Sequence, residues 1–198
     1  LPKSLNLSLN LASQNNIDLL LSDLTFQISV KESNIEKARL SPSASINFSK
    51  SEKKDFSTTI DEKDDETVKA TISWPIIKGG ENISSIKKSS LDTERAKLVL
   101  KDTKNQVSTD TANSWSKYQS YKSVLEATRS QLKAAEIANE GISLEYDSGN
   151  TRTTLEVIQS RSLLLDSRIS FAKAQKDFII SQFELAKQVG SLSFDTIN

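Results

Sequence analysis

The chain has 198 residues, of which 36% are hydrophobic and only 6% aromatic, so it is long enough for one domain but poor in the residues that build a large globular core. Its 26 basic and 26 acidic residues cancel, which removes the electrostatic argument for nucleic acid or an anionic membrane surface as a partner. Cysteine and histidine are absent, which excludes disulfides, thiolate chemistry, a histidine base and a transition-metal site. No apolar run approaches the roughly twenty residues of a membrane-spanning helix, so any bilayer contact would be made by strands. Because the chain opens on Leu1 without an initiator Met or a signal-peptide pattern, we expect a mature segment or a fragment.

The N-terminal region predicts a helix preceded by an ambiguous segment. In residues 4–14 the leucines alternate as in a strand, yet the same residues also fit a helix, and periodicity alone does not decide between the two. Residues 17–38 show apolar residues at helical spacing, and Pro42 follows as a stop signal. The apolar positions of this predicted helix are Ile17, Leu21, Leu24, Ile28, Ile35 and Ala38.

Two strands are predicted next, each with one apolar and one polar face. Their apolar positions are Ala44, Ile46 and Phe48 in the first strand and Val68, Ala70, Ile72 and Trp74 in the second. The residues between them, 49–66, are so rich in charge that we expect a water-exposed loop at the tip of a hairpin. The acidic run from Asp61 to Glu66 is expected to be solvated rather than to bind a metal, because a flexible loop does not fix ligand geometry.

The remainder predicts a long antiparallel helical hairpin. One helix is expected from about residue 81 to 146, a turn over "YDSGNTRTT" at 146–154, and a second helix from Leu155 onward. Heptad repeats place Tyr118, Leu125 and Leu132 at one position of the first helix, and Tyr121, Ala135 and Ile142 at another. The second helix has two apolar stripes, one through Leu155, Ile158, Leu165, Ile169, Ala172, Ile179, Phe183 and Ala186, the other through Leu164, Phe171, Phe178 and Leu185. Because one partner helix does not cover both stripes, we expect more than one neighbour.

This order of elements resembles one repeat of the TolC family of outer-membrane efflux and secretion channels. The resemblance covers nearly the whole chain and is carried by "SWPIIKGG" after the second strand and by Tyr146, Gly149, Thr151 and Arg152 in the turn. In that family a protomer holds two such repeats, and this chain resembles the second, with the first absent. The resemblance also favours a short helix for residues 4–14.

The resemblance implies a mainly α fold with a β-hairpin, in which long coiled-coil-like helices form an α-barrel wall and two strands join a shared transmembrane β-barrel. It divides the chain into an equatorial and α-barrel part at 1–41, a membrane hairpin at 42–77, a periplasmic helical hairpin at 78–190 and a tail at 191–198. It implies an exit duct for efflux or type I secretion in the outer membrane of a Gram-negative bacterium, extending into the periplasm. The resemblance does not indicate which substrate is exported.

The implied partners are outer-membrane lipid, further protomers in a homotrimer, a periplasmic adaptor protein and an inner-membrane transporter, with no nucleic acid and no cofactor. A periplasmic coiled-coil adaptor or other interaction protein is the alternative, but it should carry additional β-rich domains. An enzyme is rejected, because no nucleophile, base or metal cluster is recognisable.

The resemblance also implies where function concentrates. Tyr146, Arg152, Glu156 and Gln159 match positions of the periplasmic aperture, although a one-residue insertion near Asn150 shifts the alignment. Gly149, Asn150 and Thr151 match the tip that meets the adaptor, and Trp74 matches an aromatic girdle at the membrane surface. For Glu156 a second interpretation stays open, because Thr153 and Glu156 also form the pattern of a helix capping box.

Overall fold

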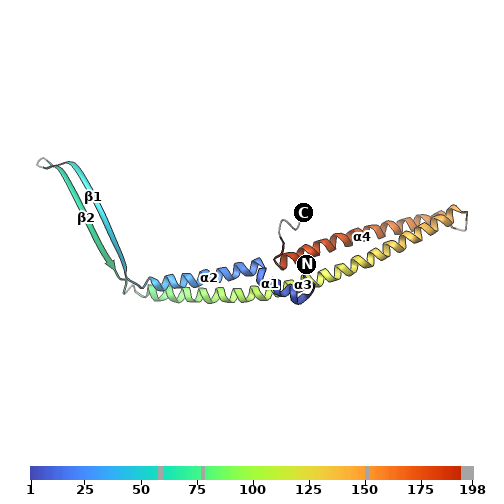
Figure 1. The fold of residues 1–198 in the computed structure, drawn as a ribbon, viewed down its shortest axis with the longest axis horizontal. Helices are drawn as coiled ribbons and strands as arrows, with labels where there is room; N and C mark the ends of the chain where they lie inside the picture. Colours follow the sequence, from blue (N-terminus) through green and yellow to red (C-terminus); the bar gives the residue numbers. More distant parts are fainter. Residues whose placement is uncertain (58–59, 77–78, 150–151, 193–198) are drawn as a thin grey trace. The chain divides into compact units, whose positions relative to one another are not determined.

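The computed structural model describes residues 1–57, 60–76, 79–149 and 152–192. In chain order the elements are α1 (Leu5–Asn15), α2 (Ile17–Ala38), β1 (Ser43–Ser57), β2 (Ile60–Ser73), α3 (Glu81–Asp147) and α4 (Thr154–Gln188). Two compact units are formed, one from residues 1–22 and 100–198 and the other from residues 23–99, so α3 contributes to both. Within each unit helices run side by side, α4 along the later part of α3 and α2 along its first part (Figure 1). The predicted mainly α fold with one β-hairpin is confirmed.

The junction of α1, α2 and the end of α4 is the most tightly buried part of the first unit. Asn16, only 3% exposed, separates α1 from α2. Its Oδ1 accepts a hydrogen bond from the Leu19 amide at 3.2 Å, and its Nδ2 donates to the Gln188 carbonyl at 2.9 Å. Ser4 caps α1 by accepting from the Leu7 amide, which resolves residues 4–14 as a helix. One amide side chain therefore starts α2 and ties it to the last residue of α4.

The seam between α3 and α4 is lined largely by small residues. On α4 the buried positions Ser160, Ser167, Ala174 and Ser181 recur every seven residues. They alternate along the helix with the second predicted stripe, in which Leu185 is fully buried and Phe178 stacks on Tyr118 of α3 with ring centroids 5.7 Å apart. Across the seam Ser160 donates to Asn139 Oδ1 at 3.0 Å. Close helix packing follows from these short side chains, whose hydroxyls also bond to backbone carbonyls of their own helix.

The first predicted stripe of α4 is not covered by this chain. Leu155, Ile158, Leu165, Ile169, Ile179 and Phe183 are all exposed. Ala186, at the end of the stripe, is buried. The helix thus buries small residues against α3 and leaves its large aliphatic residues in contact with solvent, which is the reverse of an isolated helical hairpin.

The second unit repeats this arrangement between α2 and the start of α3. Ser29 and Ser33 are buried on α2, and Thr93 of α3 donates to the Ser29 carbonyl at 3.1 Å. Leu24 and Ile28 remain more than half exposed on the same helix. The unit is again held together through small polar residues while aliphatic side chains face away.

The β-hairpin is longer than expected. Ser43 pairs with Ser73, Phe48 with Val68, and the ladder continues through Lys50 and Glu66, so the predicted loop at 49–66 is wrong. Both faces of this two-stranded ribbon are exposed, so charged side chains incur no burial cost there. Lys50 pairs with Glu52 at 3.0 Å and with Glu66 across the ladder at 3.7 Å. A high charge density therefore does not prevent strand formation in this segment.

The second strand ends at Ser73, one residue before Trp74, which the sequence had included in it, because Pro75 has no amide to continue the ladder. Trp74 follows it, is 62% exposed and donates from its indole nitrogen to the Leu40 carbonyl at 3.0 Å. Over the part of the chain that the structure describes, every helix is too short or too polar to cross a membrane.

Candidate aperture site at the turn between α3 and α4

The turn at the end of α3 brings several predicted site residues together. α3 ends at Asp147, and Gly149 follows with φ of +73°, a conformation that favours glycine. The Gly149 amide donates to the Tyr146 carbonyl at 3.1 Å. Asn150 and Thr151, the other two predicted tip residues, lie outside the described residues.

Glu156 closes the start of α4. The Thr153 amide donates to Glu156 Oε2 at 2.7 Å, and the Glu156 amide donates to Thr153 Oγ1 at 3.3 Å. This is the reciprocal pair of a capping box, so the capping interpretation is confirmed. The aperture interpretation stays a prediction, because it concerns contacts with other chains.

Arg152 connects the two helices of the hairpin. Its Nε donates to Glu145 Oε2 on α3 at 2.6 Å, and its terminal nitrogen donates to Glu156 Oε1 on α4 at 3.1 Å. The Arg152 side chain is 41% exposed, so solvent weakens both ion pairs. The guanidinium nevertheless holds the last turn of α3 and the first turn of α4 in one charge-assisted network.

These contacts shift two pKa values in opposite directions. The pKa of Glu156 is lowered, first by the hydrogen bond from the Thr153 backbone and then by the Arg152 side chain, since both favour the carboxylate. The pKa of Arg152 is raised further, chiefly by its hydrogen bond to Glu145. The turn therefore contains a permanently charged cation between two carboxylates.

The other two predicted aperture residues lie close to this network. The Tyr146 hydroxyl is 3.3 Å from Thr154 Oγ1, which links the end of α3 to the start of α4 a second time. Gln159 lines a groove of about 230 Å³ between the helices, together with Arg152 and Glu156. All four predicted aperture residues thus lie close to the turn between α3 and α4. Tyr146, Arg152 and Glu156 make hydrogen bonds there, and Gln159 lines the groove beside Arg152 and Glu156.

Glu145 is a member of the network that sequence reasoning missed. It lies seven positions before Arg152, and the turn after α3 lies between them, so the two residues are not related by the periodicity of one helix. The sequence signal that could have identified Glu145 is the position of Arg152 between two glutamates, Glu145 and Glu156, near the turn of the hairpin.

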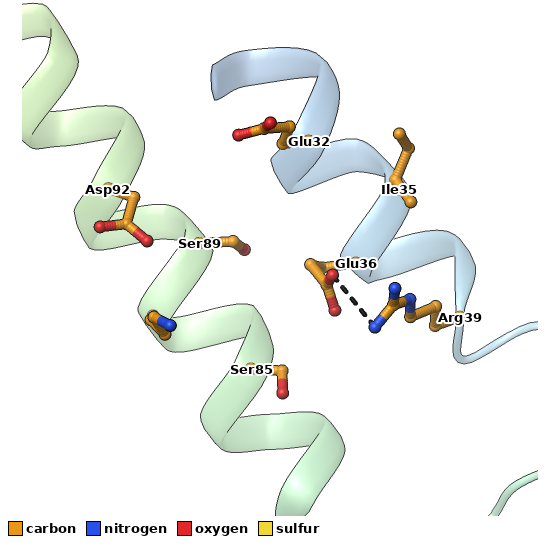
Figure 2. A pocket seen from close by; sticks show the side chains of 8 residues that line it. Glu32, Ile35, Glu36, Arg39, Ser85, Ser89 and Asp92 are labelled. Carbon is orange, nitrogen blue, oxygen red and sulfur yellow. Dashed lines mark ion pairs between the residues drawn. The ribbon is translucent and has the colours of Figure 1, made fainter. Parts of the chain in front are cut away.

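A second groove, of about 390 Å³, lies in the other unit between α2 and α3. In Figure 2, Glu36 is paired with Arg39, and Ser85 and Ser89 extend from α3 toward α2. Ile35 points away from α3 in the same view. The groove is lined by both acidic and basic side chains. The described residues contain no group of acidic side chains arranged to hold a metal ion.

Comparison with known proteins gives a consistent result. The family model described as "outer membrane efflux protein" matches residues 8–191. The outer membrane efflux protein BepC of Brucella suis is 24% identical over 126 residues, which is 64% of this chain and 27% of that protein.

Solved channels share the fold. The CmeC outer membrane channel of Campylobacter jejuni superposes with a TM-score of 0.86 and 16% identity, covering 98% of this chain and 42% of that one. The outer membrane protein VceC of Vibrio cholerae gives a TM-score of 0.75 and 17% identity, covering 94% and 46%. The chain therefore spans less than half the length of each of these three proteins.

Proposed function

Because the chain belongs to the outer membrane efflux protein family, we propose that it forms the second repeat of a protomer in an outer-membrane exit duct. The covered lengths of the solved channels, 42% and 46%, fit one of two repeats per protomer. In this proposal residues 42–77 enter the membrane, residues 1–41 and 78–190 build the wall of a periplasmic tunnel, and residues 191–198 form a tail.

The exposed stripe of α4 carries the proposal. Leu165 and Ile169 lie on a face that this chain leaves open, whereas the face toward α3 alternates serine and alanine with larger residues such as Phe178. A helix with two apolar stripes on different faces packs against two neighbours, as the wall of a closed ring of helices requires. The same ring supports a homotrimer of two-repeat protomers as the assembled state.

The hairpin supports a membrane location for the other end of the duct. Ile46, Ala70 and Ile72 lie on one face of the ribbon, and Asn47 and Thr71 lie on the other. Lipid contact on one face and a water-filled lumen on the other is the pattern of a strand in a closed transmembrane barrel. Trp74 follows the last ladder pair, Ser43–Ser73, and would contribute to an interfacial girdle.

The α3–α4 turn is proposed as part of the periplasmic aperture. Three symmetric copies of Glu156 would bring three carboxylates around a constriction, which favours cations. Tyr146 and Arg152 would fix the ends of the helices that form it, while Gln159 would add polarity without charge. The tip at 149–151 is proposed to meet the periplasmic adaptor, which in turn carries an inner-membrane transporter.

The alternative function as a coiled-coil adaptor is favoured by no observation. The proteins that this chain resembles are described as efflux proteins and channels, and the β-hairpin is the part that an adaptor of this kind does not need.

Assembly through the α4 stripe can be tested on the complete protein that carries this chain. Leu165→Asp with Ile169→Asp should abolish the trimer seen by size-exclusion chromatography with light scattering, because it places charge at the centre of the proposed contact. Ser170→Asp is the matched control, since Ser170 is exposed and lies on α4 about 140° around the helix axis from Leu165 and about 100° from Ile169. A trimer that survives the double substitution would contradict the proposed use of this face.

A further inference from the structure

The two faces of the β-hairpin differ over only part of its length. On one face the cross-strand rows Ala44–Ile72, Ile46–Ala70 and Phe48–Val68 are apolar. The next two rows on that same face are Lys50–Glu66 and Glu52–Asp64. Over the same length the opposite face is polar, as in the rows Ser45–Thr71 and Ser51–Asp65. From the Ser49–Thr67 row to the Glu52–Asp64 row both faces are therefore polar, so the distinction between a lipid side and a water side ends at Phe48 and Val68.

The apolar part of this face is short compared with a bilayer. From Val68 to Trp74 there are six residue steps, which span about 20 Å along a strand at roughly 3.4 Å per residue. A tilt of about 40° reduces this length to about 16 Å along the membrane normal. Adding Ile76, which lies beyond the strand, would extend it only to about 21 Å. Transmembrane barrels usually present an apolar band about 25 Å tall, so the face is too short by about 4 to 9 Å.

The charged rows cannot make up this difference by entering hydrocarbon. Lys50 is paired with Glu52 and Glu66, but Asp64 lies directly opposite Glu52, so these four residues carry a net negative charge. Charged side chains on the lipid face become more destabilising the deeper they lie. With Trp74 at one surface of a band about 25 Å tall, the Lys50–Glu66 row would lie about 21 Å in, inside the hydrocarbon, and the Glu52–Asp64 row about 26 Å in, at the other surface.

We propose that the hairpin fits an unusually thin bilayer, with its lipid contact ending at the Phe48–Val68 row and the charged part of the strands continuing into water. The partner of this surface is a bilayer whose hydrocarbon is thinner than usual, either throughout or by local thinning around the protein. The long charged ribbon, with polar residues on both of its faces, is then an extension of the sheet outside the membrane rather than part of the crossing.

This inference rests on the proposed function, because it assumes that the hairpin lies in a membrane. The test uses the complete protein that carries this chain, reconstituted into dilauroyl, dimyristoyl and dioleoyl phosphatidylcholine, each kept above its melting transition. The measured quantity is the temperature at which the oligomer dissociates in each lipid, read from gel mobility after heating. The wild-type oligomer should be most heat-resistant in dilauroyl lipid and lose resistance steadily as the acyl chains lengthen.

Lys50→Leu with Glu66→Leu extends the apolar face by one row and should move the optimum to a longer lipid. Ser51→Leu with Asp65→Leu adds the same apolar groups to the opposite face and should leave the optimum where the wild type has it. An optimum for the wild type in dioleoyl lipid, or equal resistance in all three lipids, would overturn the inference even if neither variant folds. Failure to associate with any of the vesicles would instead contradict the proposed membrane location.

Discussion

Replacing Gly190 by alanine should destabilise the junction between α1 and α4 more than any other glycine-to-alanine change in the described chain. Gly190 has φ of +69°, and a Cβ built on it would lie 2.1 Å from the Asn15 carbonyl oxygen and 2.5 Å from its carbon. A left-handed conformation costs a non-glycine residue roughly 1–2 kcal/mol. Forcing extra volume into a packed site typically costs a further 1–3 kcal/mol, so the total is about 2–5 kcal/mol. That is a large fraction of the roughly 5–15 kcal/mol by which a domain is stable.

Two other glycines separate these contributions. Gly149 has φ of +73° but nothing within 4 Å of an added Cβ, so Gly149→Ala should show the conformational cost of about 1–2 kcal/mol alone. Gly141 lies inside α3 with no positive φ and no atom within 4 Å of an added Cβ, so Gly141→Ala should stabilise by about 0.5–1 kcal/mol.

The assay is thermal unfolding followed by circular dichroism at the helical band, with all variants at one protein concentration. The expected order of melting temperature is Gly141→Ala highest, then wild type, Gly149→Ala and finally Gly190→Ala. Equal melting temperatures for the Gly149 and Gly190 variants would refute the argument, because the close approach of Asn15 would then contribute nothing.

Three further predictions concern the hairpin of α3 and α4. Glu156→Gln should lower the melting temperature at neutral pH and weaken cation preference in planar bilayers, and a loss of stability with unchanged selectivity would leave only the capping role. The difference in stability between this variant and wild type should shrink and disappear as the pH falls below about 4.3, the ordinary pKa of a glutamate. The reason is that the pKa of Glu156 is lowered in the folded state, so its carboxylate stabilises the fold at higher pH and this contribution is lost when the carboxylate is protonated. Arg152→Ser should raise single-channel conductance by releasing α3 from α4, and unchanged conductance would argue against a gating role. Cysteines replacing Leu132 and Ser167 should form a crosslink within one chain, because they lie seven residues from the Asn139–Ser160 hydrogen bond in opposite directions along antiparallel helices; crosslinks only between chains would contradict the hairpin.

Element boundaries were predictable where a local interaction determines them. The helix expected at about 81–146 is found at 81–147, and the turn contains the capping box that Thr153 and Glu156 suggest. Such signals act within a few residues of the chain and need no tertiary contact. The charged strands were missed for the complementary reason, since Lys50 finds Glu66 only after the ladder has formed.

The direction in which α4 faces could not be predicted from periodicity. A heptad pattern shows that a stripe exists, but both stripes of α4 satisfy it equally well. The stripe richer in aliphatic residues, including Ile158 and Ile169, is exposed, while the seam toward α3 alternates serine and alanine with larger residues. Burial within this chain therefore does not follow the usual ranking of hydrophobicity, which is what the proposed assembly requires, because in it the larger apolar residues contact neighbouring helices.

The network around Glu156 implies that the proposed aperture can open while the cap at the start of α4 stays intact. Glu156 Oε2 accepts hydrogen bonds from the Thr153 amide and hydroxyl, and Oε1 accepts from Arg152, so both oxygens are engaged within the chain. To turn toward other protomers or a passing cation, the carboxylate must give up at least one of these partners. Releasing Arg152 costs little, because that pair is exposed to solvent, and Arg152 also has a separate solvent-exposed ion pair with Glu145 on α3. Releasing Thr153 instead leaves an amide at the helix start without its acceptor. The easier movement therefore keeps the cap intact and breaks the two exposed ion pairs of Arg152, and we propose that these pairs hold the aperture closed.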